Sequence, residues 1–192
     1  MKILTVGGFA LNKPFATLGA DSALLREGEP LFVPDNDIPY HSLIMPAIRI
    51  SRLGTAISER HAAAYCDSVS AFHVLAPAGE RQCVNGIPAG AMDRTFAPGH
   101  WSPFDASAAQ SYRLNTSKSP IGGNISAEAS IEFTAQSLNV AKIIAWLSGS
   151  MTFKTGDIIL FADYGACLGA VTINTMISAD LNGVPTLNFR IK

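Results

Sequence analysis

The sequence has few charged side chains and no cluster of one sign. Lys and Arg together number 14, Asp and Glu 15, and the formal net charge is -1. Because the basic residues are scattered, they offer no electrostatic surface for a phosphate backbone or an anionic membrane. Apolar runs of membrane-spanning length, about 20 residues, are also missing. We therefore expect neither a nucleic-acid partner nor a membrane partner.

Cysteine is scarce as well. Cys66, Cys83 and Cys167 are an odd number at wide, irregular spacings, which fits neither a disulfide framework nor a zinc site. They are interpreted as free thiols. The apolar run after Lys2 is short and ends at a Gly-Gly pair, which is typical of a first strand rather than a signal peptide. We expect a cytoplasmic protein.

What the chain does contain is a high hydrophobic fraction, 48%, arranged as short apolar runs between Gly, Pro and Asn. This pattern predicts an α+β, β-rich protein with a few short helices. No repeat or linker is visible, so residues 1–192 are predicted to form a single domain. The predicted strands are Lys2–Val6, Ser22–Leu25, Pro30–Val33, Ser42–Ser51, Ser70–Leu75, Gln110–Asn115, Ile158–Phe161, Val171–Ile177 and Pro185–Ile191, with a hairpin connection at 26–29.

Two segments have helical character. The first follows Ser58, a favourable capping residue, and continues from Glu59 through an Ala run to Cys66. The second is predicted from about Ser126 to Leu147 with a break near 137–139. In its second half, Val140, Ile143, Ile144 and Leu147 share one face.

Several segments, taken in order, resemble the fumarylacetoacetate hydrolase family. The strongest is the C-terminal part, where Met151–Leu160 and a Gly-containing loop precede two predicted strands joined through Asn182 and Gly183. Segments 49–54, with the helix after them, and 91–98 are similar to the family's ligand strand and its "FD" element. Segments 1–7 and 21–25 resemble its opening. The resemblance spans nearly the whole chain and implies the family's mixed β-sandwich roll.

The resemblance also implies a chemistry. Members of the family act on 2-oxo and 1,3-dioxo acids around Mg or Mn, in hydrolysis, decarboxylation or isomerisation. A hard divalent cation requires oxygen ligands, because it polarises the keto-carboxylate and stabilises the enolate. In the family, a Glu-x-Glu pair on a strand supplies two carboxylates on one face, and an Asp about thirty residues later supplies a third.

This sequence departs from that ligand set. Gapless alignment on Arg49 to Gly54 places Leu43 and Met45 at the two Glu positions, and His73, within one residue, at the Asp position. No register slip restores the pair, since the only glutamates between residues 22 and 60 are Glu27, Glu29 and Glu59. We expect His73 to face the same pocket.

Three further departures concern the reacting groups. Gly90 takes the position of the family's lysine, and Asp163 stands where a substrate-contacting hydroxyl is implied. The family's lid sequence, with its acid/base His, is replaced by Phe9–Lys13. Losing ligands, lysine and lid together indicates lost chemistry.

We therefore hypothesise a catalytically degenerate protein that keeps the scaffold for ligand binding or oligomerisation, with no cofactor expected and no metal ligands. The alternative is a metal-dependent hydrolase or isomerase of acylpyruvate or 2-oxo acids whose site was rebuilt from His73 and Asp163, with Mg or Mn bound. The family resemblance implies a homodimer, or a hetero-oligomer with an active relative. Leu43, Met45, Gly90, His73 and Asp163 are the candidate pocket residues.

Other candidates are weaker. His41, His61 and His100 are interpreted as packing or surface residues. Asp35 and Asp37 are acids available to a remodelled site, although 34–37 is equally a turn signal. Gly122–Asn124 is an anion-loop candidate or simply a turn before a helix. A Ser70, His73 and Asp67 triad is disfavoured, since residues 70 and 73 point to opposite faces of a strand.

Overall fold

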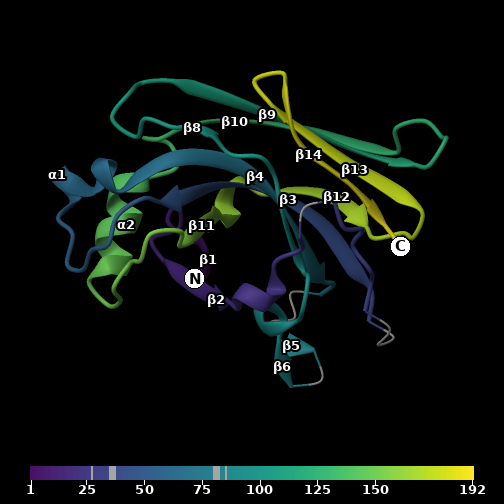
Figure 1. The fold of residues 1–192 in the computed structure, drawn as a ribbon, viewed down its shortest axis with the longest axis horizontal. Coiled ribbons are helices and arrows are strands. Elements are labelled where there is room, and N and C mark those ends of the chain that lie inside the picture. Colours follow the sequence, from purple (N-terminus) through teal and green to yellow (C-terminus); the bar gives the residue numbers. More distant parts are fainter. Residues whose placement is uncertain (27, 35–37, 80–82, 85) are drawn as a thin grey trace.

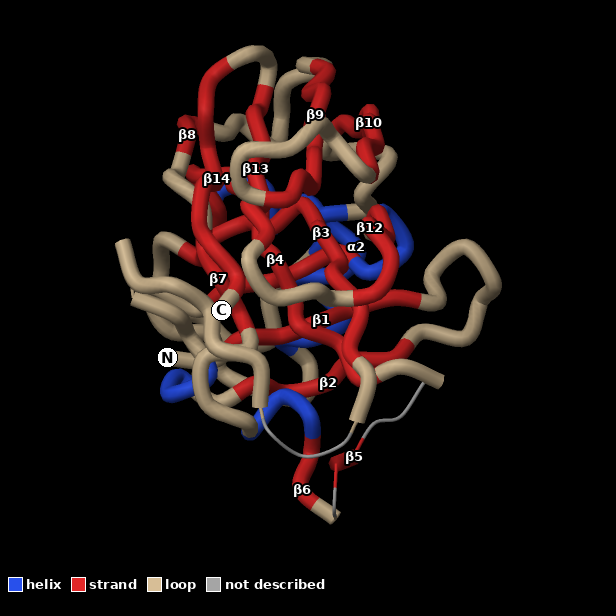
Figure 2. Tube along the Cα trace, turned by 90° about the vertical axis from the view of Figure 1, so that its right-hand side faces the viewer, coloured by secondary structure: helices blue, strands red, loops and turns tan. Residues whose placement is uncertain are grey.

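The computed structural model describes residues 1–26, 28–34, 38–79, 83–84 and 86–192. Two sheets form the layers seen in Figures 1 and 2. The large sheet contains β1 (Ile3–Gly7), β2 (Phe15–Gly19), β3 (Tyr40–Ile50), β4 (Cys66–Pro77), β7 (Phe96–Pro98), β8 (Ser102–Pro103), β11 (Ile158–Phe161) and β12 (Ala166–Ala170). The small sheet contains β9 (Ser111–Pro120), β10 (Ala127–Thr134), β13 (Thr175–Leu181) and β14 (Val184–Ile191).

The order β2-β1-β11-β3-β4-β7 places β3 near the middle of the large sheet, with β12 pairing β3 beyond the end of β11. The small sheet has the order β10-β9-β13-β14. A short hairpin of β5 (Cys83–Val84) and β6 (Ile87–Pro88) projects from the side of the large sheet away from the small one (Figure 2). Pairing is mixed, since β1 and β11 are parallel and the other named pairs are antiparallel.

Pro46 sits in the middle of β3, where a missing N–H would normally break a sheet. Along one edge of β3, β11 pairs as far as Ala47 and β12 takes over at Ile44. The proline therefore falls in the gap between two partner strands. This arrangement explains how a central strand tolerates it.

The main core lies between the sheets and under α2 (Val140–Ser148), and includes Ile44, Ile48, Leu114, Ile144 and Phe189. A smaller apolar cluster covers the opposite face of the large sheet and includes Met45, Ala47, Phe72, Phe96 and Leu160. Both faces of the large sheet are thus apolar. The alternation of side chains along β3 assigns its residues to the two clusters in turn.

The strand predictions hold where β1, β3, β4, β9, β11 and β14 form, and α1 (Glu59–Ala62) with a following 3-10 turn forms where the first helix is predicted. The predicted long helix is half wrong, because residues 127–134 form β10. There Ala127, Ala129, Ile131 and Phe133 alternate inward and pair with β9. Cross-strand pairing overrides the helical propensity of the Ala and Glu residues.

Three other predictions need correction. Residues 22–25 contain the end of a 3-10 turn rather than a strand, and 30–33 contribute only an isolated bridge from Leu31 to Ile191. The strand predicted from Val171 begins at Thr175. The predicted connection at 26–29 includes residue 27, which lies outside the described residues.

Candidate functional site

Leu43 and Met45 lie on the face of β3 that points away from the small sheet. In the register with β4, Leu43 is opposite Val74, and Met45 is opposite Phe72. Directly paired residues share a face of the sheet. These four apolar side chains consequently form one continuous stripe, with Leu43 and Val74 half-buried and the other two buried.

A cavity of about 540 Å³ lies over this stripe. Its walls come from β1, β2, β3 and β4 and from described residues of the segment from β5 to β7. The lining residues are Thr5, Thr17, Leu18, Gly19, Leu43, Met45, Val74, Leu75, Ala76, Pro77, Cys83, Pro88, Ala89, Gly90, Thr95 and Phe96. No Asp, Glu, Lys, Arg or His is found among the lining residues that the structure describes.

Gly90 forms part of the cavity wall within the 3-10 turn Ala89–Ala91. A Cβ atom added to it would lie 2.8 Å from the backbone oxygen of Leu18 on β2. Any side chain at this position would clash with backbone that the edge strand holds in place. A lysine at this position would therefore need the turn and β2 to move apart.

The expectation that His73 faces this cavity is wrong. His73 pairs with Ile44, so its ring is on the opposite face of the sheet, in edge-to-face contact with Phe189 of β14 at 5.0 Å between ring centroids. The reason is the two-residue period of a strand, which sends positions 73 and 74 to opposite faces. The alignment fixes the third ligand position only to within one residue of His73. Val74, the next residue, is the one that lines the cavity wall.

His73 is completely buried between the sheets. Its Nε2 lies 3.0 Å from Ser42 Oγ, and its Nδ1 has no hydrogen-bond partner in the described structure. Burial lowers the pKa of its imidazole to about 3, because the charged form loses its hydration. A neutral, enclosed histidine is a structural element of the interlayer core.

Asp163 is also separate from the cavity. Its two carboxylate oxygens accept hydrogen bonds from the backbone N–H groups of Gly8 and Phe9, at 2.7 and 3.1 Å. The carboxylate thereby fastens the loop between β1 and β2, where Phe9 packs edge-on against Trp146 of α2. Of the five candidate residues, Leu43, Met45 and Gly90 come together, whereas His73 and Asp163 do not.

The cavity wall does not suit a hard divalent cation. Mg and Mn require carboxylate, carbonyl or water oxygens, and the three wall positions of β3 and β4 carry Leu43, Met45 and Val74. Across the described residues, no group of three or more His, Cys, Asp or Glu is placed to hold a metal ion. The residues present thus do not fit the metal that the family resemblance implies.

The remaining candidates are dispersed. His41 lies at the start of β3, His61 in α1, and His100 after β7. Ser70 Oγ donates to the carbonyl oxygen of His100, not to His73, so no triad forms. Residues 122–124 belong to the turn before β10 rather than to a helix start, and Asp35 and Asp37 lie outside the described residues.

The three thiols have different environments. Cys66 is buried, and desolvation, with Asp67 and Asp105 nearby, raises the pKa of its thiol to about 12. Cys83 is exposed and lines the cavity. Cys167 is exposed on β12 and does not line it. The composition identifies free thiols but does not reveal that one of them lies on the cavity wall.

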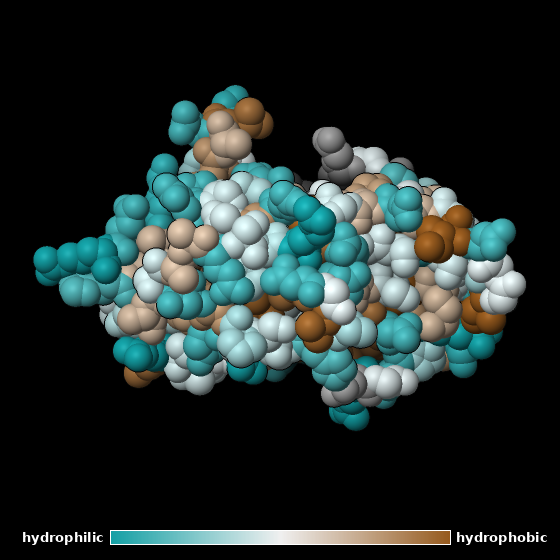
Figure 3. Space-filling model, turned by 90° about the horizontal axis from the view of Figure 1, so that it is seen from above, coloured by the Kyte–Doolittle hydropathy of each residue, from teal (hydrophilic) through white to brown (hydrophobic). Residues whose placement is uncertain are grey.

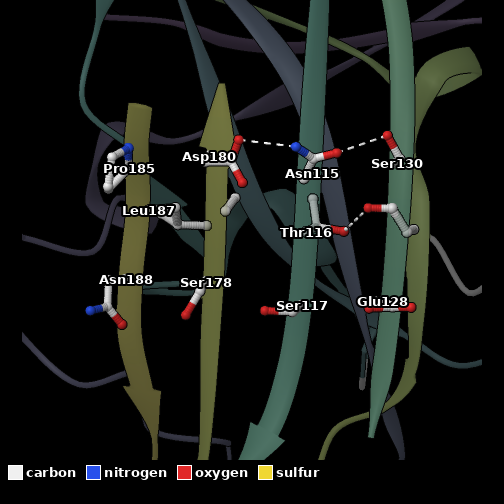
Figure 4. Close-up of a pocket in the computed structure, with 12 residues that line it drawn as sticks. Asn115, Thr116, Ser117, Glu128, Ser130, Ser178, Asp180, Pro185, Leu187 and Asn188 are labelled. Carbon is white, nitrogen blue, oxygen red and sulfur yellow. Dashed lines mark hydrogen bonds between the residues drawn. The ribbon is translucent and has the colours of Figure 1, made fainter. Parts of the chain in front are cut away.

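A larger hollow, about 730 Å³, lies on the outer face of the small sheet, and polar side chains such as Asn115, Ser130 and Asp180 are among its lining residues (Figure 4). There Asn115 Nδ2 donates to Asp180, and Ser130 Oγ donates to Asn115 Oδ1, at 3.0 and 2.9 Å. These groups satisfy one another across neighbouring strands. Figure 3 shows this side of the molecule as mainly hydrophilic, with hydrophobic residues in separate places. We interpret it as a solvated sheet face.

No family model and no curated protein matches the sequence. Solved structures match the fold over its full length. A 2-hydroxyhepta-2,4-diene-1,7-dioate isomerase from Mycobacterium marinum has a TM-score of 0.76 and 21% identity, covering 99% of this chain and 73% of that one. A fumarylacetoacetate hydrolase family protein from Yersinia pestis has a TM-score of 0.73 and 20% identity, covering 100% and 92%.

A fumarylpyruvate hydrolase from Pseudomonas aeruginosa, solved in complex with Mn2+ and pyruvate, has a TM-score of 0.71 and 17% identity, covering 100% of this chain and 89% of that one. The predicted fold is therefore confirmed. None of the described helices is long and apolar enough to cross a membrane.

Proposed function

We propose that this protein is a non-catalytic member of the fumarylacetoacetate hydrolase family that binds a small organic molecule in the cavity over β3 and β4. The observation that carries the proposal is the apolar chemistry of three wall positions, Leu43, Met45 and Val74. Two alternate positions of β3 and the facing position of β4 point into one cavity, and none offers an oxygen ligand. The scaffold remains while the means to hold a hard cation do not.

Gly90 supports the same proposal independently. The close contact with the Leu18 carbonyl leaves no space for a side chain that could bind a substrate carboxylate. An enzyme rebuilt around His73 and Asp163 would need both groups at one site, but one is enclosed between the sheets and the other is bonded to the β1–β2 loop. Binding without metal-dependent turnover is the function that this geometry favours.

The proposal is tested by titration calorimetry with Mg2+ and Mn2+ and by an acylpyruvate cleavage assay on the same purified protein. We expect no heat of metal binding and no turnover. Micromolar Mn2+ binding accompanied by cleavage would overturn the proposal and restore the metal-dependent hydrolase as the function. The homodimer stays a prediction, for which sedimentation velocity is the measurement.

A gain-of-ligand variant tests the wall assignment directly. In L43E/M45E/V74D, three carboxylates would converge in the cavity, and we expect Mn2+ binding at micromolar to millimolar Kd, as judged from the range of oxygen-ligand sites. The matched control L43Q/M45Q/V74N keeps similar side-chain shapes without charge and should bind no Mn2+. Equal behaviour of a folded carboxylate variant and its control would show that these positions do not share one site.

A further inference from the structure

The chemistry of the cavity lining specifies more than the presence of a ligand. We infer that the cavity takes an uncharged, mainly hydrocarbon molecule that carries one hydroxyl or carbonyl group. This inference rests on the proposed binding function and defines its ligand class. This ligand class is uncharged, whereas the 2-oxo acids that the family resemblance implies are anionic.

Charge is the first discriminating property. Among the described lining residues there is no cationic side chain to pair with a carboxylate, and the floor of the cavity consists of Leu43, Met45, Val74 and Phe96. Transfer of an ionised carboxylate into such surroundings loses hydration that no partner replaces. A neutral molecule avoids that cost and gains from every methylene that it buries.

A single polar position lies on one side of the cavity. Thr5 on β1 is directly opposite Thr17 on β2, and both line the cavity. In the described part of the chain, neither hydroxyl has a protein hydrogen-bond partner. Thr95 differs, since its hydroxyl already donates to the carbonyl oxygen of Met92 at 3.0 Å. Thr5 and Thr17 can therefore donate to and accept from one ligand oxygen.

The volume sets the size of the ligand. About 540 Å³ is within the range of roughly 300–1,000 Å³ that is typical of small-molecule sites. Linear neutral alcohols of six to ten carbons are suitable probes for such a site. Each added methylene is expected to tighten binding about fourfold while the chain still finds apolar wall.

Cys83 provides a site-specific readout. It is exposed and lines the cavity, whereas Cys167 is exposed outside the lining and Cys66 is buried. The experiment measures the rate of iodoacetamide alkylation at each cysteine by peptide mapping, in the presence of 1-octanol or octanoate. We expect 1-octanol to slow the alkylation of Cys83 and leave that of Cys167 unchanged. Protection by octanoate should need a roughly tenfold higher concentration, since an unpaired buried charge costs more than 1.4 kcal/mol.

Removal of the two hydroxyls tests the polar position. T5V/T17V should weaken 1-octanol binding about fivefold, the equivalent of one net hydrogen bond. It should leave the fourfold increment per methylene unchanged. The matched control T175V removes a hydroxyl that already donates to the carbonyl oxygen of Thr172 and does not line the cavity, so it should leave 1-octanol affinity unchanged.

Equal or stronger protection of Cys83 by octanoate would overturn the neutral ligand class. Absence of protection by either probe would overturn the cavity as a site for this class. Both results are independent of metal binding and turnover, which test the proposed function itself. Protection by 1-octanol combined with Mn2+-dependent cleavage would reject the non-catalytic function while retaining the apolar site.

Discussion

The two faces of the large sheet differ although both are apolar. One face is closed by the small sheet, and along β3 and β4 it buries Ser42, Ile44 and His73 completely. The other face carries Leu43 and Val74 only half-buried at the wall of a cavity. Adjacent residues of the same strands thus either pack in the closed core or line the cavity, and the second layer decides which.

The largest difference is expected from truncations of neighbouring residues. Ile44→Ala should lower the free energy of unfolding by about 3 kcal/mol, because it leaves a void in a closed core. Leu43→Ala should cost less than about 1 kcal/mol, because its side chain already borders the cavity. Chemical denaturation of both variants measures the contrast. Similar losses would indicate that the cavity face is as tightly packed as the interlayer core.

The second prediction concerns pH and the closed face. The pKa of His73 is lowered to about 3 in the folded protein from the ordinary histidine value of about 6.5, so the unfolded chain binds the proton first as pH falls. The contribution of neutral His73 to the free energy of unfolding is therefore fully present above about pH 6.5 and is lost progressively as the pH falls toward 3. Between pH 6.5 and 5 the loss should be about 2 kcal/mol, at about 1.4 kcal/mol per pH unit.

His73→Gln should flatten this slope, while His41→Gln, at the start of the same sheet's β3, serves as the matched control. The window above pH 5 largely avoids the titration of carboxylates such as Asp157. Burial opposes ionisation of that group, but hydrogen bonds from Lys2 and Lys154 outweigh it, and the pKa of its carboxyl is lowered. An unchanged slope in His73→Gln would show that this histidine is not the titrating group.

The smallest effect is expected at the rim of the open face. Gly90→Ala places a methyl group against the Leu18 carbonyl and should cost about 1 to 2 kcal/mol of stability. It should also weaken 1-octanol binding by narrowing the cavity. Gly149→Ala is the control, since an added Cβ there lies 3.4 Å or more from its neighbours. Loss of stability without loss of binding would separate Gly90 from the cavity wall.

Most of the fold could be predicted from apolar runs and their order along the chain. The prediction of Ile158–Phe161 coincides with β11, and the last predicted strand differs from β14 by one residue. The helix prediction for residues 127–134 is wrong because Ala and Glu favour helices locally, whereas the pairing with β9 is not visible in the local sequence. The inward alternation of Ala127, Ala129, Ile131 and Phe133 is the sequence signal for a strand.

The candidate site was also partly predictable from the order of segments along the chain. The alignment brings Leu43, Met45 and Gly90 together correctly in space, although their role in binding stays a prediction. The sequence also predicts His73 and Asp163 at the same pocket, but the structure separates them from it. The sequence does not indicate that Thr5, Thr17 and Cys83 belong to this site, because only the arrangement of β1, β2 and β5 makes them neighbours of Leu43.

The sequence by itself determined the chemistry available to this site, since residues 40–50 contain no glutamate and the wall positions of β3 are Leu and Met. Only the tertiary structure decided which side chains share the cavity. On a strand, a shift of one residue reverses the face, so the register between β3 and β4 places Val74 at the cavity and encloses His73 between the sheets. The identity of each residue is a local property, whereas the face of the sheet on which its side chain lies depends on the pairing of strands that are distant in the sequence.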